Sequence, residues 1–494
     1  MSPGRGLPPW LVLPSLVVGG VVAACGIGML ISAAVGLVSD GREILAVAIP
    51  GAAALLIGAF TMRVATGRAT PQLTIRPTSG FAAVTLAWVA AAAVGAVPLL
   101  VTDTFSSPLD AYFEAMSGFT TTGATLIADI EAQPDGVLMW RSMTQWMGGI
   151  GIVVLVVSIA PVSGPALQRA FYAEVSGVTA ERLTPRIVDT AKIVAGIYLA
   201  LSVAAAGAYL IAGMNAFDAV AQMFTSVSTG GFSVRNDSIA GFDSVAIELV
   251  AIAVMILAAI NFAFYWRAIR GGALRPQLAE VRAFLLILTV STIAVTASLL
   301  IADDVGGAAE ALRQAAFSVI TINTGTGYTT ADFDAWNEFA RLGLLFLMFV
   351  GGCAGSTAGG MKVIRVILLG RIAEQEVTRQ LQPSSVQVLR LGGRPFPEVV
   401  RAAVLSFALV YALVFLVGAF ALAITGVDLV TAISGTSATL NIVGPGLGDV
   451  GAAESFTAVP AGGRAVGLVL MLIGRLEVFT VVALLAALFR LGRR

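Results

Sequence analysis

The sequence predicts an all-α membrane protein with about ten transmembrane helices, because apolar residues dominate it and gather in long runs. Of its 494 residues, 57% are hydrophobic and 12% are charged, which is more apolar than a soluble core requires. Runs of roughly 20 apolar residues, the length that crosses a bilayer, occupy residues 10–38, 44–62, 78–102, 138–160, 188–213, 243–266, 281–301, 339–372, 398–425 and 464–490. The first run outlasts a signal-peptide core and lacks a small-residue cleavage site, so we expect it to be retained.

Basic residues are concentrated in alternate connections between these runs and at the end of the chain. They are Arg63, Arg68, Arg76, Arg169, Arg182, Arg186, Arg267, Arg270, Arg275, Lys362, Arg365, Arg371, Arg379, Arg390, Arg394, Arg490, Arg493 and Arg494. The positive-inside rule then predicts a multi-pass protein of the cytoplasmic (inner) membrane with both termini cytoplasmic. The other connections carry mostly acids. An acidic outer face would attract cations, although loops that merely avoid arginine outside would give the same pattern.

The chain contains no histidine and only two cysteines, Cys25 and Cys353, each inside an apolar run. These counts exclude Ser-His-Asp catalysis, His-ligated zinc and thiolate metal sites, and they argue against a disulfide framework. No P-loop is present, and the glycine clusters do not follow a strand of a βαβ unit. We therefore expect a protein that is not an enzyme, with membrane lipid around it, no cofactor on this chain and no nucleic-acid partner.

An internal repeat follows two extra N-terminal spans (residues 1–76). The rest divides into four similar blocks, each with a long apolar helix, a shorter segment, a polar glycine-containing stretch and another long apolar helix. The blocks are 77–165, 166–272, 273–394 and 395–494. We call the polar stretches glycine segments 1 to 4; they read "FTTTGAT" (119–125), "VSTGGFS" (227–233), "NTGTGYT" (323–329) and "LNIVGPG" (440–446). Aligned without gaps, all four have glycine at their fifth position: Gly123, Gly231, Gly327 and Gly444.

The segments that precede these stretches are too short to cross a bilayer, which predicts re-entrant half-helices. They cover about 109–118, 217–226, 309–321 and 429–439. Asp110, Asp218 and Asp428 stand near three of the starts, where a helix N-terminus favours a carboxylate.

If each half-helix dips in from outside, its C-terminal end points to the membrane centre and favours a cation there. Glycine would let successive carbonyl groups of the following stretch face an ion. Taken singly, each stretch could equally be a loop or a small-residue helix contact. Four in register favour an ion filter.

These stretches resemble the four pore loops of the Trk/Ktr/HKT superfamily of potassium transporters, most closely its TrkH/TrkG branch. Three further stretches agree: "RSMTQWMGGIGIVVL" (141–155), "GGCAGSTAGGMKVIR" (351–365) and "IGRLEVFT" (473–480). The resemblance runs from about residue 78 to the end. It implies four M1–pore helix–M2 units around a pseudo-fourfold axis, and potassium uptake with potassium as the substrate.

The resemblance also implies which residues form the selectivity filter. They are Thr121, Thr122, Gly123, Thr229, Gly230, Gly231, Thr324, Gly325, Thr326, Gly327, Asn441, Ile442, Val443 and Gly444. Potassium would bind at the fourth and fifth positions: Thr122, Gly123, Gly230, Gly231, Thr326, Gly327, Val443 and Gly444. Members that prefer sodium often have serine at the first filter glycine, so Gly123 indicates potassium, in a branch that discriminates only moderately against sodium. Gly325 stands where threonine is more usual, which suggests a looser third segment.

The run 339–372 contains "GGCAGSTAGG", a poor helix because each glycine costs roughly 1 kcal/mol relative to alanine. The break could be a kink or a hinge. The resemblance implies that residues 351–360 form an intramembrane loop below the filter whose movement gates the pore. The implied gating residues are Gly351, Gly352, Gly355, Ser356, Thr357, Gly359, Gly360, Lys362 and Arg475.

Arg475 and Glu477 lie inside the last span, where ionisable groups are expensive and face a cavity or a partner. The resemblance implies that Arg475 reaches the intramembrane loop as a barrier beneath the filter. The alternative is a structural one, in which Arg475 and Glu477 pair with each other or with a backbone carbonyl. We expect Glu114 and Arg141 to be structural, bracing the first pore helix or the fourth span.

The resemblance implies a homodimer on a cytoplasmic nucleotide-binding regulatory subunit of the TrkA/KtrA kind, for which the basic connections, including 363–394, are docking surfaces. The alternative function is an ion-coupled secondary transporter of a small organic solute, although such folds usually show two related halves rather than four. Channel-like conduction and proton- or sodium-coupled symport use the same architecture, and the sequence leaves both open.

Overall fold

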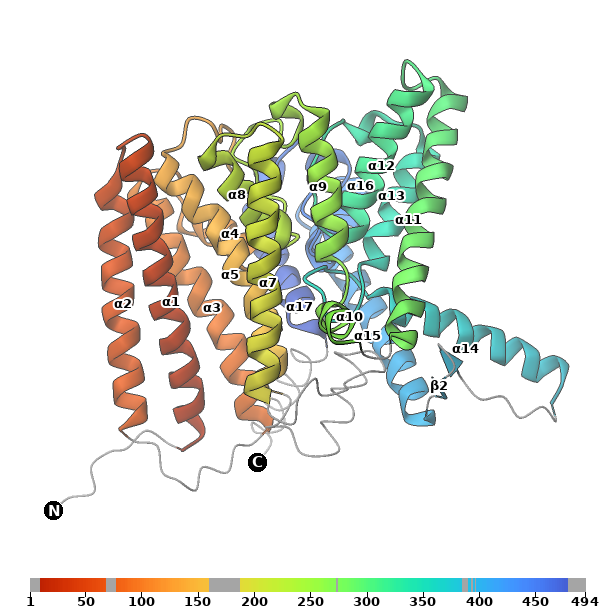
Figure 1. The fold of residues 1–494 in the computed structure, drawn as a ribbon, viewed down its shortest axis with the longest axis horizontal. Coiled ribbons are helices and arrows are strands. Elements are labelled where there is room, and N and C mark those ends of the chain that lie inside the picture. The colour runs from red at the N-terminus through yellow and green to blue at the C-terminus, as the bar shows by residue number, and fades with distance from the viewer. Residues whose placement is uncertain are drawn as a thin grey trace.

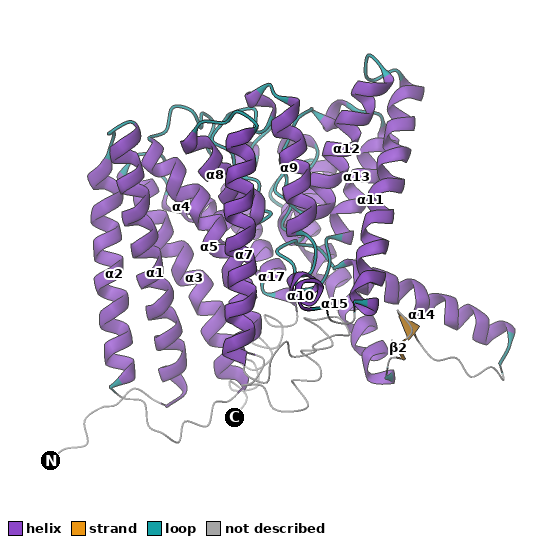
Figure 2. Cartoon of the chain, viewed as in Figure 1, coloured by secondary structure: helices purple, strands orange, loops and turns teal. Residues whose placement is uncertain are grey.

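A computed structural model describes residues 9–67, 77–159, 187–271, 274–383, 390–391, 394–395 and 397–478. Over these ranges the chain is almost entirely helical, and most helices stand side by side as an upright bundle (Figures 1 and 2).

Six helices of the described residues are long and apolar enough to cross a membrane. They are α1 (Pro9–Ser39), α2 (Ile44–Thr66), α3 (Pro77–Val101), α7 (Ile187–Ile211), α11 (Arg275–Ala302) and α15 (Glu398–Ala423). The first two form a hairpin at one edge of the bundle (Figure 1). Glycine lets these two backbones touch, since a Cβ atom on Gly58 would overlap the backbone nitrogen of Ala23.

Four shorter helices enter the bundle between the long ones. They are α4 (Pro108–Phe119), α8 (Ala216–Val227), α12 (Ala308–Thr324) and α16 (Leu429–Leu440). A helix rises 1.5 Å per residue, so each is shorter than the roughly 30 Å of a bilayer core. These are the half-helices that the sequence predicts.

The N-termini of the half-helices carry the three predicted carboxylates. Asp110 lies in the first turn of α4 and pairs with Arg464 at 2.7 Å. Asp218 lies in the first turn of α8 and pairs with Arg235 at 2.8 Å. Asp428 caps α16 at the surface, and the hydroxyl and backbone N–H of Thr431 lower the pKa of this carboxyl through hydrogen bonds.

The other elements follow the half-helices in the chain. The helices are α5 (Asp135–Ile159), α9 (Val245–Ala258), α10 (Phe262–Arg270), α13 (Glu338–Val350), α14 (Val363–Leu381) and α17 (Ala461–Arg475). Single 3₁₀ turns are η1 (Ala240–Phe242), η2 (Phe333–Ala335), η3 (Gly448–Val450) and η4 (Phe456–Ala458). Strands β1 (Arg390–Leu391) and β2 (Arg394–Pro395) pair as a small antiparallel hairpin. Figure 1 shows α14 projecting sideways from the bundle beside this hairpin.

The core between these helices is aromatic where α5, α7 and α8 meet. The ring of Trp146 lies 5.7 Å from that of Tyr198 and 5.4 Å from that of Phe224. Trp146 also donates a hydrogen bond from its indole nitrogen to the hydroxyl of Ser202 at 3.0 Å. A large ring whose polar atom has a partner is a stable anchor, and this one fixes α5 beside glycine segment 2.

The all-helical membrane fold is confirmed. The described residues supply six uninterrupted spans, or seven if α9 and α10 count as one span. The predicted span 243–266 is wrong as a straight helix, because α9 and α10 meet at 84°. The break expected within the span 339–372 is present, because α13 and α14 are separated by irregular chain. Residues 479–490 of the last span lie outside the described residues.

Several sequence predictions likewise fall outside the described residues. They include the block boundaries at 165–166 and 272–273 and the basic residues Arg68, Arg76, Arg169, Arg182, Arg186, Arg490, Arg493 and Arg494.

Candidate functional site

The four glycine segments begin where the half-helices end, and they share one backbone pattern. In each segment the third and fifth residues have φ in the left-handed region. The third residues are Thr121 (57°), Thr229 (52°), Gly325 (72°) and Ile442 (59°), and the fifth are Gly123 (84°), Gly231 (81°), Gly327 (78°) and Gly444 (95°). Because the residue between them keeps a negative φ, successive peptide planes rotate in opposite senses and their carbonyl groups face the same side.

This pattern bears on Gly325, the unusual third residue of segment 3. Threonine and isoleucine are strained at a left-handed φ, whereas glycine is not. The left-handed backbone at the third position is therefore less strained at Gly325 than at Thr121, Thr229 and Ile442 of the other segments.

A second shared feature anchors each segment to its own half-helix. The N–H of the fourth residue donates to the helix carbonyl five residues earlier, at 2.8–2.9 Å in every case. The pairs are Thr122 with Ser117, Gly230 with Thr225, Thr326 with Thr321, and Val443 with Ala438. Their agreement across four unlike sequences indicates that the segments are structurally equivalent.

The fifth-position glycines bring the four segments together as a closed ring. A Cβ atom on Gly123 would overlap the carbonyl oxygen of Gly230 in segment 2. In the same way, Gly231 approaches the fourth-position carbonyl of segment 3 and Gly327 that of segment 4. Gly444 then closes the ring, since its Cβ would lie 2.7 Å from the carbonyl oxygen of Thr122 in segment 1. Each glycine leaves room for the fourth-position carbonyl of the next segment.

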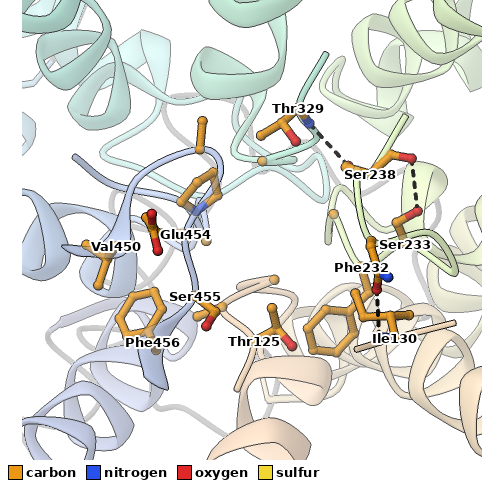
Figure 3. A pocket seen from close by; sticks show the side chains of 18 of the residues that line it. Thr125, Ile130, Phe232, Ser233, Ser238, Thr329, Val450, Glu454, Ser455 and Phe456 are labelled. Atoms are coloured by element: carbon orange, nitrogen blue, oxygen red, sulfur yellow. Dashed lines mark hydrogen bonds between the residues drawn. The ribbon is translucent and has the colours of Figure 1, made fainter. Parts of the chain in front are cut away.

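A cavity of about 90 Å³ lies directly beside this ring. Its lining includes all four fifth-position glycines together with residues from each of the four loops that follow. In Figure 3, Thr125, Ser233, Thr329 and Glu454 stand around a central opening and come from four differently coloured parts of the chain. We call this cavity the vestibule. Its volume holds several water molecules, or a partly hydrated ion.

Two arginines at the vestibule are each paired with a carboxylate. Arg141 of α5 binds Glu114 of α4 at 2.6 Å, and both side chains are buried. Arg141 also donates to the carbonyl of Ser233 at 3.0 Å and stacks 3.7 Å above the ring of Phe232. These contacts tie α4 to segment 2, as expected for a structural pair. The other vestibule arginine, Arg235, pairs with Asp218.

The irregular residues 351–362 lie at the half-helix C-terminal ends. The hydroxyl of Thr357 donates to the carbonyl of Val227, the last residue of α8, at 3.2 Å. The N–H of Gly360 donates to the carbonyl of Asn441 at 3.1 Å, and Asn323 of α12 donates to the carbonyl of Gly351 at 3.1 Å. We call residues 351–362 the intramembrane segment.

The gap between α9 and α10 holds the other side of the intramembrane segment. The N–H of Cys353 donates to the carbonyl of Ala259 at 2.9 Å, and the N–H of Phe262 donates to that of Gly355 at 3.2 Å. The bend that breaks the predicted span 243–266 leaves these two backbone groups free to bond with the intramembrane segment.

Arg475, at the end of α17, lies between the intramembrane segment and segment 1. Its guanidinium donates to the hydroxyl of Thr121 at 2.9 Å, the carbonyl of Thr357 at 3.4 Å and the carbonyl of Gly148 at 2.7 Å. Only 3% of the residue is exposed. Arg475 thus contacts the intramembrane segment, while its role as a barrier stays a prediction.

Arg475 and Glu477 do not form the ion pair offered as a structural alternative. Glu477 pairs with Arg365 of α14 at 2.7 Å instead. The other structural alternative, in which Arg475 bonds to backbone carbonyls, agrees with its contacts to Thr357 and Gly148. Lys362, a further predicted gating residue, donates from Nζ to the carbonyl of Ala358 within the intramembrane segment.

The structure thus brings the predicted filter and gating residues into one column through the centre of the bundle; their roles stay predictions. Sequence reasoning missed three residues that hold this column. Gln145 contacts segment 2 at Gly230, Tyr328 donates to the side chain of Gln222 at 2.9 Å, and Glu280 accepts from the N–H of Ala354 at 2.7 Å. Glu280 stands immediately before the apolar run 281–301. An ionisable residue at the edge of a membrane span is a signal that could have identified it.

Comparisons with known proteins agree with this geometry. The sequence matches the TrkH family model, described as a cation transport protein, over residues 52–490. It is 40% identical over 421 residues to the Trk system potassium uptake protein TrkH of Vibrio parahaemolyticus, covering 84% of this chain and 86% of that protein. It is 30% identical over 418 residues to the Trk system potassium uptake protein TrkG of Escherichia coli strain K12, with the same two coverages of 84% and 86%.

The fold is also similar to the crystal structure of the potassium transporter TrkH from Vibrio parahaemolyticus. The TM-score is 0.86 at 36% identity, over 96% of this chain and 98% of that one. These relatives are transport proteins and not enzymes, as the sequence predicts. The chain therefore belongs to the TrkH family of cation transport proteins.

Proposed function

We propose that this protein takes up potassium across the cytoplasmic membrane, with potassium as substrate rather than cofactor, through a filter formed by the four glycine segments. The observation that carries the proposal is the closed ring in which each fifth-position glycine borders the next segment's fourth-position carbonyl. Relatives at 30–41% identity are named potassium uptake proteins, which supports potassium as the substrate.

The chemistry of the proposed filter is the replacement of an ion's water shell by backbone oxygen. Carbonyl groups that face one side, and are not hydrogen-bonded to each other, can coordinate a dehydrated cation. The four half-helices end directly before the glycine segments of the ring, and each C-terminus contributes a partial negative charge. Both terms favour a cation and require no carboxylate at the binding position.

We infer that the intramembrane segment gates this pathway from below. It bonds to the ends of α8, α12 and segment 4, so it can close the column only while these contacts hold. Lys362 and Arg475 add positive charge to the closed state, which raises the barrier for a cation. Displacing the segment breaks these hydrogen bonds and also moves Cys353 and Ala358, which are buried in the core.

We also propose that the vestibule faces outward and that both termini are cytoplasmic. The loops that carry Asp103, Asp237 and Asp332 lie at the vestibule end of the bundle, whereas Arg267, Arg270 and Arg371 lie in or after the helices that leave it. The proposed assembly is a homodimer on a nucleotide-binding regulatory subunit of the TrkA/KtrA kind, with α14 and the hairpin that follows it as a docking surface.

Rubidium flux into proteoliposomes tests this function. We expect uptake that excess potassium blocks, under a voltage gradient and with the pH gradient varied independently. A dependence on the pH gradient would indicate coupled symport, and its absence channel-like conduction. Uptake of an amino acid or sugar without rubidium flux would instead establish the organic-solute alternative.

The filter assignment is tested by Gly123→Ser. The added side chain would meet the carbonyl of Gly230 and force the ring to change shape, so the ratio of rubidium to sodium uptake should fall toward sodium. Gly343→Ser is the matched control, because no atom lies within 4 Å of a Cβ at Gly343 in α13. An unchanged ratio in folded Gly123→Ser protein would show that segment 1 is not part of the filter.

A further inference from the structure

One of the four fourth-position carbonyls differs from the other three. Among the hydrogen bonds of the described residues, the carbonyl oxygens of Thr122, Thr326 and Val443 accept none, whereas that of Gly230 accepts one from a side chain. The donor is Nε2 of Gln145 in α5, at 2.6 Å. Gln145 is fully buried.

The same amide makes a second contact with segment 2. Oε1 of Gln145 accepts from the N–H of Phe232 at 3.1 Å. The two contacts fix which end of the amide is which, since the reverse orientation would place oxygen against oxygen and nitrogen against N–H. Gln145 therefore holds segment 2 on both sides of Gly231, the fifth-position glycine.

Glycine at position 230 is a condition of this contact. A Cβ atom there would overlap the amide group of Gln145. The corresponding residues of the other segments are Thr122, Thr326 and Val443, all with side chains. Segment 2 thus combines a side-chain-free fourth position with a clamp from the neighbouring long helix.

We propose that Gln145 is a specificity-determining residue for the filter, an inference that rests on the proposed function. Its amide holds the Gly230 carbonyl in place, so this side of the ring resists moving inward around a smaller ion. It also takes up part of the electron density of that carbonyl, which lowers the field that the ring exerts on a cation. Ring size and ligand field are the two accounts of potassium selectivity, and on either account the amide favours potassium over sodium.

Two substitutions separate the parts of this contact. Gln145→Met keeps the length of the side chain and removes both hydrogen bonds. Gln145→Glu retains an acceptor for the N–H of Phe232 but, when ionised, has no donor for the Gly230 carbonyl. We expect both variants to lower the ratio of rubidium to sodium uptake in proteoliposomes, roughly fivefold if one hydrogen bond of discrimination is lost.

The control is Gln277→Met in α11, a buried glutamine that makes no hydrogen bond to a glycine segment among the described residues. It should leave the ratio unchanged. For any variant that transports too little to measure, the second readout is the difference between the melting temperatures in potassium and in sodium. This difference should be smaller for Gln145→Met and Gln145→Glu than for the wild-type protein.

The outcomes distinguish this inference from the function on which it rests. Suppose that the wild-type protein takes up rubidium, but both Gln145 variants keep its rubidium-to-sodium uptake ratio and its melting-temperature difference between potassium and sodium. That result would overturn the role of Gln145 and leave the proposed function standing. Wild-type protein that takes up no rubidium would overturn the proposed function and this inference with it.

Discussion

Arg475 joins three parts of the molecule through one guanidinium. It contacts Thr121 at the start of the proposed filter, Thr357 in the intramembrane segment and Gly148 in α5. A buried cation on the ion pathway repels a permeating cation strongly because the surrounding dielectric is low. The hydrogen bond to Thr357 also holds the intramembrane segment in place.

We therefore expect Arg475→Ala to raise basal rubidium flux several-fold, because both the charge and the contact with Thr357 are lost. The exposed Arg379→Ala in α14, where 61% of the arginine side chain is accessible, is the control and should leave flux unchanged. The measurement is rubidium uptake per folded protein, with the amount of folded protein taken from size-exclusion chromatography. A lower flux from fully folded Arg475→Ala protein would refute the barrier role.

Single residues also show how far the sequence could predict the site. The fifth-position glycines can be identified from the sequence because they occur four times in register. Such a repeat is recognisable without a structure. Gln145 occurs once and has no counterpart in the other blocks, so no alignment within the chain could reveal it. Its partner Gly230 lies 85 positions away, and such a contact depends on how α5 packs.

At the scale of the element, the ends of the half-helices determine where the glycine segments lie. Asp428 caps α16 by accepting hydrogen bonds from the N–H groups of Val430 at 3.0 Å and Thr431 at 3.1 Å. Loss of such a cap costs about 1 kcal/mol. We expect Asp428→Ala to lower the apparent melting temperature in detergent, and Glu310→Ala, an exposed first-turn acid of α12, to change it little.

The pH dependence of this cap has a definite sign. The pKa of Asp428 in the fold lies below its ordinary value of 3.8, so the carboxylate stabilises the protein above that value, and the stabilisation disappears as the pH falls through the lower folded pKa. Asp428→Asn keeps an acceptor and removes the charge. Its melting temperature should therefore differ from wild type at neutral pH and converge with it in acid. A constant difference across that range would contradict the assignment.

The bend between α9 and α10 is harder to predict from the sequence than the half-helices are. Length alone identified the half-helices, since about ten residues cannot cross a bilayer. The break between α9 and α10 leaves only a weak trace, because Ala259 and Ile260 continue the apolar run. Only Asn261 interrupts it, a polar residue that caps α10 by accepting from the N–H of Ala263 at 2.8 Å. The break is stabilised by bonds from Cys353 and Phe262 that form only when the intramembrane segment is in place. The bend between α9 and α10 therefore depends on tertiary contacts, which a hydropathy pattern does not reveal.

On the scale of the whole molecule, the ring joins the first and last of the four blocks, since Gly444 closes it against Thr122. The sequence could show that four blocks are alike, but likeness alone does not show that the fourth packs beside the first. That closure leaves one polar column, with a vestibule at one end and the intramembrane segment at the other. Its direction across the membrane decides whether the vestibule collects ions from outside or from the cytoplasm.

Cysteine labelling tests this direction, because Cys25 and Cys353 are buried and free and should react little. Glu338, whose side chain is 88% exposed at the start of α13, lies toward the vestibule end of the bundle. Arg371, 56% exposed in α14, lies toward the other end. In intact cells, a membrane-impermeant maleimide should label Glu338→Cys but not Arg371→Cys, and permeabilised cells should show both. Labelling of Arg371→Cys alone in intact cells would reverse the orientation, and the arginine-rich connections would then face outward against the positive-inside rule.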